Sequence, residues 1–255
     1  MSAYSLIDTH CHPQMDDYKD DRDAMIGRAL DAGIAMIAVG IDFESSKQGI
    51  DIANTYSGVW ASVGLHPNDN INEPYNQDAY EELLKDSKVV AIGEIGLDFY
   101  RTKKQEDQDF QRARFLKQLD LVEQSSKPVI IHCRDAHEQM RGILSQKNLS
   151  GVIHSFTGTV EDVVAYTQMG FHIGINGIAT FSDQLISAIQ AIPKDKILLE
   201  TDAPFLAPAK YRGKRNEPLY IEDTARRVGE IMNVSYTDIC KISKVNTSNL
   251  FGIDL

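Results

Sequence analysis

Close to its beginning, the chain carries the segment Leu6-Ile7-Asp8-Thr9-His10-Cys11-His12. The segment starts with apolar residues and ends with two histidines separated by one residue. In an extended strand, residues two apart point to the same side. His10 and His12 can therefore bind one metal ion while Cys11 faces away, and Asp8, on the same side, can orient a ligating imidazole.

Four more residues of metal-binding types follow short apolar runs later in the chain: Glu94, His132, His154 and Asp202. The runs before them cover residues 89–92, 129–131, 152–153 and 197–199. A carboxylate such as Glu94 can bridge two cations with its two oxygen atoms. The order of these residues therefore indicates a binuclear metal centre, which can turn water into a nucleophile at neutral pH.

Short strand-like runs alternate with amphipathic helical segments along the whole sequence. We expect strands at residues 4–8, 34–39, 59–64, 88–93, 128–132, 151–154, 171–174 and 196–200. We expect helices near residues 20–32, 43–56, 76–86, 105–126, 135–146, 159–169, 182–191, 217–232 and 235–250. Eight strands separated by helices predict a (β/α)₈ TIM barrel, a member of the α/β class, as a single metal-dependent hydrolase domain over residues 1–255.

The positions of the ligand candidates favour closure of the sheet into a barrel. They follow the first, fourth, fifth, sixth and eighth expected strands, at the C-terminal end of each. An open, doubly wound sheet is the alternative, but it does not bring these strand ends together. In a barrel they meet on the face where barrel enzymes build their active sites.

The composition is that of an ordinary globular protein, with 42% hydrophobic residues and a net charge of −11. No apolar run approaches the roughly 18 residues expected of a membrane span, and the first residues lack the pattern of a secretory signal. We expect a cytoplasmic protein without membrane contact or an obligate protein partner. The three cysteines do not form a disulfide framework, and we expect Cys11 and Cys133 to be buried thiols.

The acidic balance argues against a broad, non-specific hold on nucleic acid, which needs many phosphate contacts from lysine and arginine. It leaves room for local basic surfaces, and the sequence has two basic clusters: Arg101, Lys103 and Lys104, then Lys210, Arg212, Lys214 and Arg215. A solvated surface is the alternative interpretation of each cluster.

Six motifs spread over residues 8–204 make the chain resemble one known family. They are Asp8-Thr9-His10-Cys11-His12, Gly64-Leu65-His66-Pro67, Gly93-Glu94-Ile95-Gly96-Leu97-Asp98, Ile131-His132-Cys133-Arg134, His154-Ser155-Phe156-Thr157-Gly158 and Glu200-Thr201-Asp202-Ala203-Pro204. In this order they are similar to the motifs of the TatD family of metal-dependent deoxyribonucleases. Asn216 and Pro218 continue the likeness, whereas Ser155 stands where many members carry cysteine.

The resemblance implies a barrel hydrolase with two divalent metal ions (Mg²⁺, Mn²⁺, Zn²⁺ or Ni²⁺) and 3′-to-5′ exonuclease action on DNA. It implies that one ion is held by His10, His12 and Asp202 together with Glu94. It implies that the second ion is held by Glu94, His132 and His154.

Further residues are candidates for substrate binding. His66 follows the third expected strand and can contact a phosphate or a metal-bound water; a capped loop histidine is the alternative. Arg134 lies two residues beyond His132, so it points to the same side and can clamp a phosphate, unless it forms a surface ion pair. The remaining candidates follow the Asp202 motif: Lys210, Arg212, Lys214, Arg215 and Asn216.

The hypothesis that follows is a 3′-to-5′ exodeoxyribonuclease acting on single-stranded DNA. A two-metal-activated water attacks phosphorus, and Glu94 and Asp202 are the catalytic residues, with Asp202 accepting the proton. Two divalent ions, two carboxylates and one hydroxide leave a net charge of about +1, which favours an anionic substrate. Phe99 and Tyr100 can stack on a terminal base.

Two alternatives stay open. The same metals can serve an amide or ester hydrolase, for example one that acts on aminoacyl-tRNA esters. A non-catalytic scaffold barrel is the more remote alternative, because such a protein is expected to lose ligand residues and none is missing here.

Overall fold

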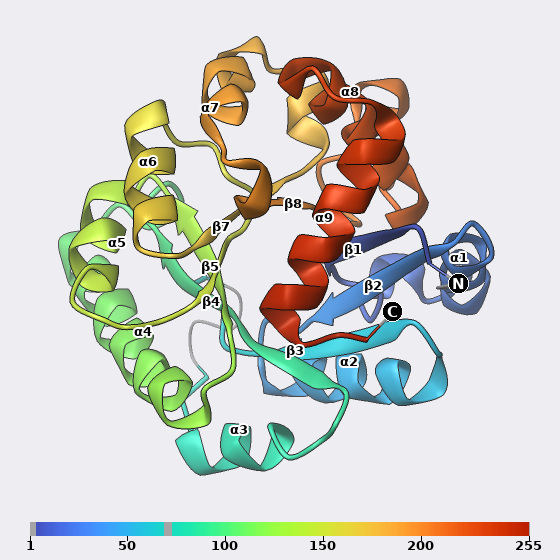
Figure 1. Cartoon of the computed structure of the whole chain (residues 1–255). Coiled ribbons are helices and arrows are strands. Elements are labelled where there is room, and N and C mark those ends of the chain that lie inside the picture. The colour runs from blue at the N-terminus through green and yellow to red at the C-terminus, as the bar shows by residue number, and fades with distance from the viewer. Residues whose placement is uncertain (1–3, 69–72, 255) are drawn as a thin grey trace.

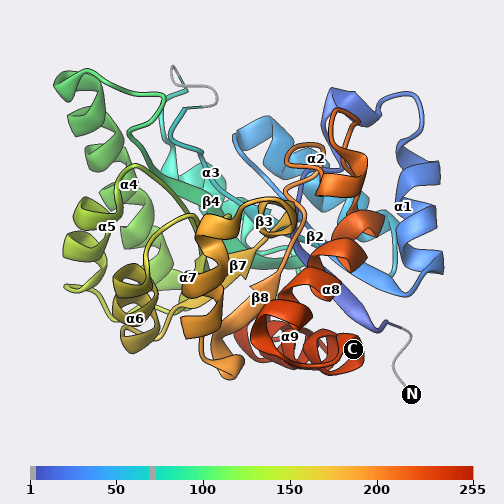
Figure 2. The same cartoon turned by 90° about the horizontal axis from the view of Figure 1, so that it is seen from above.

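The computed structural model describes residues 4–68 and 73–254 and shows the predicted (β/α)₈ TIM barrel (Figures 1 and 2). Eight parallel strands follow one another around the sheet in sequence order: β1 (Leu6–Cys11), β2 (Ile34–Val39), β3 (Val59–Val63), β4 (Val89–Asp98), β5 (Val129–Arg134), β6 (Gly151–Ile153), β7 (His172–Ile175) and β8 (Ile197–Leu199). The helices surround this sheet: α1 (Arg22–Asp31), α2 (Phe43–Thr55), α3 (Gln77–Leu83), α4 (Gln105–Ser125), α5 (His137–Leu144), α6 (Val160–Gln168), α7 (Ile186–Ala191), α8 (Ile221–Met232) and α9 (Tyr236–Phe251).

The first and last strands meet through side-chain hydrogen bonds and, just beyond β8, a short backbone bridge between Cys11 and Ala203, rather than a regular ladder. Thr9 donates its hydroxyl hydrogen to the carbonyl of Leu199, over 3.1 Å. Asp8 accepts hydrogen bonds from the backbone N–H and the hydroxyl of Thr201. Burial raises the pKa of Asp8 to about 8, against the opposing effect of the hydrogen bond from Thr201. The side chain of Asp8 therefore holds β1 to the segment after β8, and the expectation that it orients a ligating imidazole is wrong.

The N-terminal end of the barrel is filled by the end of the chain. Phe251 and Ile253 are buried against inward-facing residues of the strands: Ile37, Val39, Ala91, Ile130, Val152 and Leu198. Helix α9 lies across this end in Figure 2, and its Asn246 amide donates to the carbonyls of Lys194 and Ile197 at the start of β8. Because this end is closed, a substrate can enter only from the C-terminal ends of the strands.

Three strands extend at least two residues beyond their expected ends. Strand β1 continues to Cys11, β4 to Asp98 and β5 to Arg134, so His10 and Glu94 lie within strands instead of after them. Glycine makes the extension of β4 possible. Gly96 has φ 152°, and a Cβ atom there would lie 1.9 Å from the carbonyl oxygen of His132 on β5. Only a residue without a side chain can approach the neighbouring backbone so closely.

We predict that Gly96→Ala destabilises the barrel by at least about 3 kcal/mol, because backbone atoms cannot move aside as a flexible side chain can. Thermal unfolding followed by circular dichroism should show a midpoint lower by roughly 6 °C or more. Gly142→Ala is the matched control, since Gly142 lies in α5 and a Cβ atom there would meet nothing within 4 Å beyond the backbone of its own helix. Equal midpoints for the two variants would contradict the close approach of β4 to β5.

Candidate metal centre

The six predicted ligand residues lie together at the C-terminal end of the barrel. The carboxylate of Glu94 lies between histidines from three other strands. Its Oε2 is 3.3 Å from His10 Nε2. Its Oε1 is 2.7 Å from His132 Nδ1 and 3.0 Å from His154 Nε2. The two oxygen atoms thus face different histidines, as a carboxylate that bridges two cations requires.

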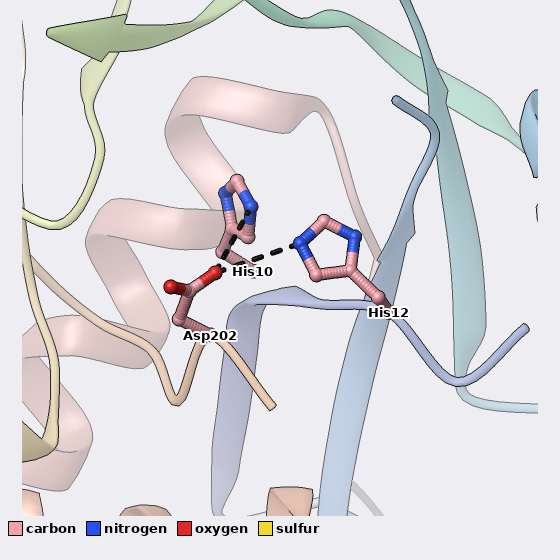
Figure 3. A group of neighbouring side chains, drawn as sticks. All are labelled: His10, His12 and Asp202. Atoms are coloured by element: carbon pink, nitrogen blue, oxygen red, sulfur yellow. Dashed lines mark ion pairs between the residues drawn. The ribbon is translucent and has the colours of Figure 1, made fainter. Parts of the chain in front are cut away.

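Asp202 lies beside the histidine pair at the end of β1 (Figure 3). Its Oδ1 is 3.5 Å from His12 Nε2 and 3.7 Å from His10 Nε2. The backbone of Asp202 is in the left-handed region, with φ 59°, and its N–H donates to the carbonyl of His10. This hydrogen bond fixes the position of the Asp202 carboxylate relative to β1. The side chains of His10, His12 and Asp202 therefore surround a single space.

His66 belongs to the same cluster. Its Nε2 is 3.7 Å from Glu94 Oε1, and its ring centroid is 4.5 Å from that of His132. Donor atoms of His66, Glu94 and His132 lie within 4.8 Å of one another, as do those of His10, His12 and Asp202. The structure therefore places His66 near enough to contact a metal ion as well as a substrate.

Sequence reasoning missed two carboxylates that support the histidines. Asp98 Oδ2 is 3.3 Å from His132 Nε2, and Glu200 Oε1 is 3.2 Å from His154 Nδ1. A signal for both was present in the spacing. Asp98 is four residues after Glu94 and Glu200 is two before Asp202, so each has the alternation that puts it on the side of a ligand candidate.

The room for Glu200 comes from a glycine on the adjacent strand. Gly174 of β7 faces the Glu200 carboxylate, and a Cβ atom there would lie 2.3 Å from Oε2. Glu200 is fully buried, and its Oε1 also accepts the backbone N–H of Ser155. The second oxygen of this carboxylate has no hydrogen-bond partner among the described residues.

The donor set fits divalent metal ions. Nδ1 of His10 is buried without a hydrogen-bond partner in the part of the chain that the structure describes. Leaving buried polar atoms unpaired is costly, so such atoms are expected to bind something. Imidazole and carboxylate donors together suit Zn²⁺, Mn²⁺ or Ni²⁺.

The charges of the cluster are strongly coupled. Burial alone would raise the pKa of Glu94, but His154, His66 and His10 lower it well below its usual value. Burial alone would lower the pKa of His154, but the carboxylates of Glu94 and Glu200 raise it well above its usual value. At neutral pH the metal-free site therefore holds a proton on His154, and a metal ion that uses this imidazole must displace it.

The pocket above this cluster has a volume of about 330 Å³. Arg101 and Arg134 line it, and the guanidinium of Arg134 lies 3.9 Å from the centre of the Tyr100 ring. Tyr100 is half exposed, whereas Phe99 is buried. Of the arginines that sequence reasoning proposed for phosphate, Arg134 is thus the one that reaches the pocket.

The basic cluster after β8 does not line this pocket. Arg215 forms an ion pair with Asp21, with N–O distances of 2.7 and 2.8 Å. Lys210 lies 4.0 Å from Asp223. The guanidinium of Arg212 covers the ring of Phe181, 4.1 Å from its centre. The backbone N–H of Lys214 donates to a carbonyl of the same loop.

Asn216 is fully buried beneath this loop. Its side-chain amide donates to the carbonyls of Thr201, over 3.0 Å, and Phe205, over 2.6 Å. These bonds hold the turn that follows Asp202. The structure therefore places Asn216 under the loop rather than in the pocket.

Cys11, Cys133 and Cys240 are buried free thiols, and Cys11 points toward the carbonyl of Ile37, away from the histidine pair. Among the residues described, no helix has the length and apolar character needed to cross a membrane.

We predict that metal binding releases protons and weakens as the pH falls, because imidazoles must be neutral to bind a metal ion. Calorimetric titration of Mn²⁺ at pH 7, in buffers of different protonation enthalpy, should give a proton release that Glu200→Gln reduces. The raised pKa of His154 depends on this carboxylate.

His172→Gln is the control for this measurement. Burial lowers the pKa of His172 to about 4, so its ring is neutral at pH 7 and carries no proton to release. Proton release that is unchanged in Glu200→Gln, or is lost in His172→Gln, would contradict the assignment of the proton to the metal cluster.

Comparison with known proteins agrees with this geometry. The family model described as TatD related DNase matches residues 7–252. The uncharacterized metal-dependent hydrolase YabD of Bacillus subtilis is 34% identical over 98% of this chain and 100% of its own length. The 3'-5' ssDNA/RNA exonuclease TatD of Escherichia coli K12 is 34% identical over 92% of this chain and 95% of its own. The crystal structure of the TatD homolog YJJV from Escherichia coli superposes with a TM-score of 0.92 at 27% identity, covering 99% and 100% of the two chains.

Proposed function

The chain belongs to the TatD related DNase family of metal-dependent hydrolases, and we propose that it is a 3′-to-5′ exonuclease that hydrolyses the phosphodiester bonds of single-stranded DNA. The observation that carries the proposal is the position of Glu94, whose two oxygens face different histidines at the bottom of a pocket with arginines at its rim. The relatives named as 3'-5' ssDNA/RNA exonucleases support the direction and the single-stranded substrate.

The residues that would hold the metal ions are those brought together around Glu94. His10, His12 and Asp202 would hold one ion with Glu94. Glu94, His132 and His154 would hold a second. When bound, such ions lower the pKa of water and stabilise negative charge on a phosphoryl group.

Asp202 is the residue that accepts the proton of the attacking water. Burial would raise its pKa, but the hydrogen bond from His12 and the charges of His154 and His10 lower it. The carboxylate is therefore ionised at neutral pH and ready to take a proton. It is also partly exposed to the pocket, with 15% of its side chain accessible, where a water can reach it.

The pocket arginines supply the attraction for an anion. The site contains four carboxylates, from Glu94, Asp98, Glu200 and Asp202, rather than the two counted from the sequence. Four carboxylates cancel the charge of two divalent ions, so the centre itself would carry no net positive charge. Arg101 and Arg134, at the rim, then bind the phosphates of the strand.

We predict that the wild-type chain shortens single strands from the 3′ end when Mg²⁺ or Mn²⁺ is added, and that Glu94→Ala loses more than about 99% of this activity. A lost carboxylate at the centre should cost several kcal/mol of transition-state stabilisation, which is about 100-fold or more. Strands labelled at the 5′ or the 3′ end distinguish the direction on a denaturing gel.

Glu44→Ala is the control for this variant, because Glu44 is an exposed residue in the first turn of α2. The proposal fails if Glu94→Ala, folded by circular dichroism, keeps a tenth of the wild-type turnover. It also fails if the wild-type chain cuts aminoacyl esters but no strand, which would favour the ester hydrolase.

We predict that Arg134→Gln raises the KM for an oligonucleotide about 10-fold, because a charge-assisted contact to phosphate is lost. Arg212→Gln and Lys214→Gln should raise the KM less than Arg134→Gln does. Their effect should appear in the salt dependence of strand binding. Each lost phosphate contact should reduce the slope of log K against log salt by about 0.7 for a single strand. An unchanged slope in both loop variants would show that the cluster after β8 is a solvated surface.

A further inference from the structure

The pocket above the metal centre has two chemically different sides. The residues at its mouth follow the strands in order, so the barrel fixes which of them are neighbours. The segments after β7, β8, β1 and β2 contribute apolar side chains: Ile178, Phe205, Leu206, Met15 and Ile41. The segment after β4 contributes Arg101, and β5 ends in Arg134.

This division is a consequence of the strand order. Strands β7, β8, β1 and β2 are consecutive around a closed barrel, and β4 and β5 lie across from them. One side of the mouth is therefore largely apolar, and the opposite side carries the two arginines. The metal donors lie between the two sides, at the bottom.

A nucleotide has the same division, with an apolar ring system at one end and a charged phosphate at the other. The pocket volume of about 330 Å³ is near the lower limit of ligand pockets, so it suits one such unit and not a duplex. If the phosphate faces the arginines and the metal donors, the base must lie against the apolar side.

Phe205 is the aromatic residue of that side. Its side chain is 49% exposed although it lines the pocket, and its ring centroid lies 6.3 Å from that of His12. A base on the Phe205 ring would thus sit directly beside the metal donors. A contiguous exposed patch of large apolar side chains often marks a binding site.

The backbone holds Phe205 in this position from two sides. Its N–H donates to the carbonyl of Asp202, over 2.8 Å, and its carbonyl accepts the amide of Asn216, over 2.6 Å. The same short turn therefore fixes a metal ligand candidate and an exposed ring. Asn216, which does not reach the pocket, acts as a positioning residue through this turn.

Tyr100 is another exposed aromatic ring, beside the pocket residue Arg134, and it is less available. The guanidinium of Arg134 lies 3.9 Å from its centre, and the ammonium group of Lys103 lies 5.1 Å away. Over the described parts of the chain, no cation covers Phe205. Tyr100 is thus used to orient Arg134, whereas the ring of Phe205 remains open.

From this geometry we propose that Phe205 stacks on the base of the 3′-terminal nucleotide and forms a base-binding subsite while the scissile phosphate faces Arg101 and Arg134. This inference rests on the proposed exonuclease function. Stacking is tolerant of sequence, because every base has a flat face. The subsite therefore recognises the presence of a terminal base and does not distinguish one base from another.

The test combines a change in the protein with a change in the strand. Phe205→Ala should lower kcat/KM roughly 5- to 150-fold on a strand with a normal 3′-terminal nucleotide. It should change kcat/KM less than twofold on a strand whose terminal residue is abasic, since the stacking partner is already absent. Phe205→Trp should keep activity near that of the wild type on both.

Phe110→Ala is the matched control, because Phe110 has a similar exposure of 51% but lies on α4, outside the pocket. Equal losses on normal and abasic ends would overturn the proposal, as would full activity of Phe205→Ala on the normal end. A loss that disappears only when the penultimate base is removed would overturn the assignment to the terminal base.

A second measurement separates this proposal from the proposed function. A strand that ends in 2-aminopurine, with a methylene group in place of the bridging oxygen of its last linkage, can bind without being cut. Its fluorescence should be quenched by the wild-type chain and not by Phe205→Ala. Quenching without hydrolysis of natural strands would refute the exonuclease and leave the base subsite standing. Hydrolysis without quenching would refute the subsite alone.

Discussion

The hydrogen bonds between Asp8 and Thr201 are the constraint on which the rest of the site depends. They join β1 to the segment after β8, so a residue near the beginning of the chain contacts one that lies nearly two hundred residues later in the sequence. Asp202, one residue beyond Thr201, is thereby placed beside His10 and His12. Together with the backbone hydrogen bond from Asp202 to His10, this contact closes the barrel and assembles three of the proposed metal ligands. A chain that failed to close would lose the metal site and the fold together.

Glu94 depends on a second constraint, the close packing of β4 against β5. Glycine at position 96 lets the two backbones approach, and this brings His132 to within 2.7 Å of the Glu94 carboxylate. Glycine at position 174 leaves room for the carboxylate of Glu200, which in turn contacts His154. The site thus requires glycine at both positions, because the absence of a side chain leaves space for the backbone of β5 at position 96 and for the Glu200 carboxylate at position 174.

The sequence was sufficient for the architecture, since strands and helices have different apolar periodicities and every expected strand is present. It was also sufficient to bring the six ligand candidates to one face, because strand ends in a barrel share that face. It was insufficient for the partners of those residues. Asp98 and Glu200 matter because of imidazoles that come from other strands, and the pairing of Arg215 with Asp21 crosses almost the whole chain. Local spacing can put Asp98 and Glu200 on the side of a ligand candidate, but it does not say which side chain from another strand each of them contacts.

The charge distribution limits how a strand can be recognised. The chain has a net charge of −11, and Lys210 and Arg215 of its strongest basic cluster face carboxylates of the same molecule. Long-range attraction for a polyanion is therefore weak, and contacts within the pocket must supply the affinity. Short-range contacts of two kinds are available there, ionic ones at Arg134 and a stacking surface at Phe205. A pocket of this kind would hold the end of a strand more firmly than its length, as the proposed removal of one nucleotide at a time requires.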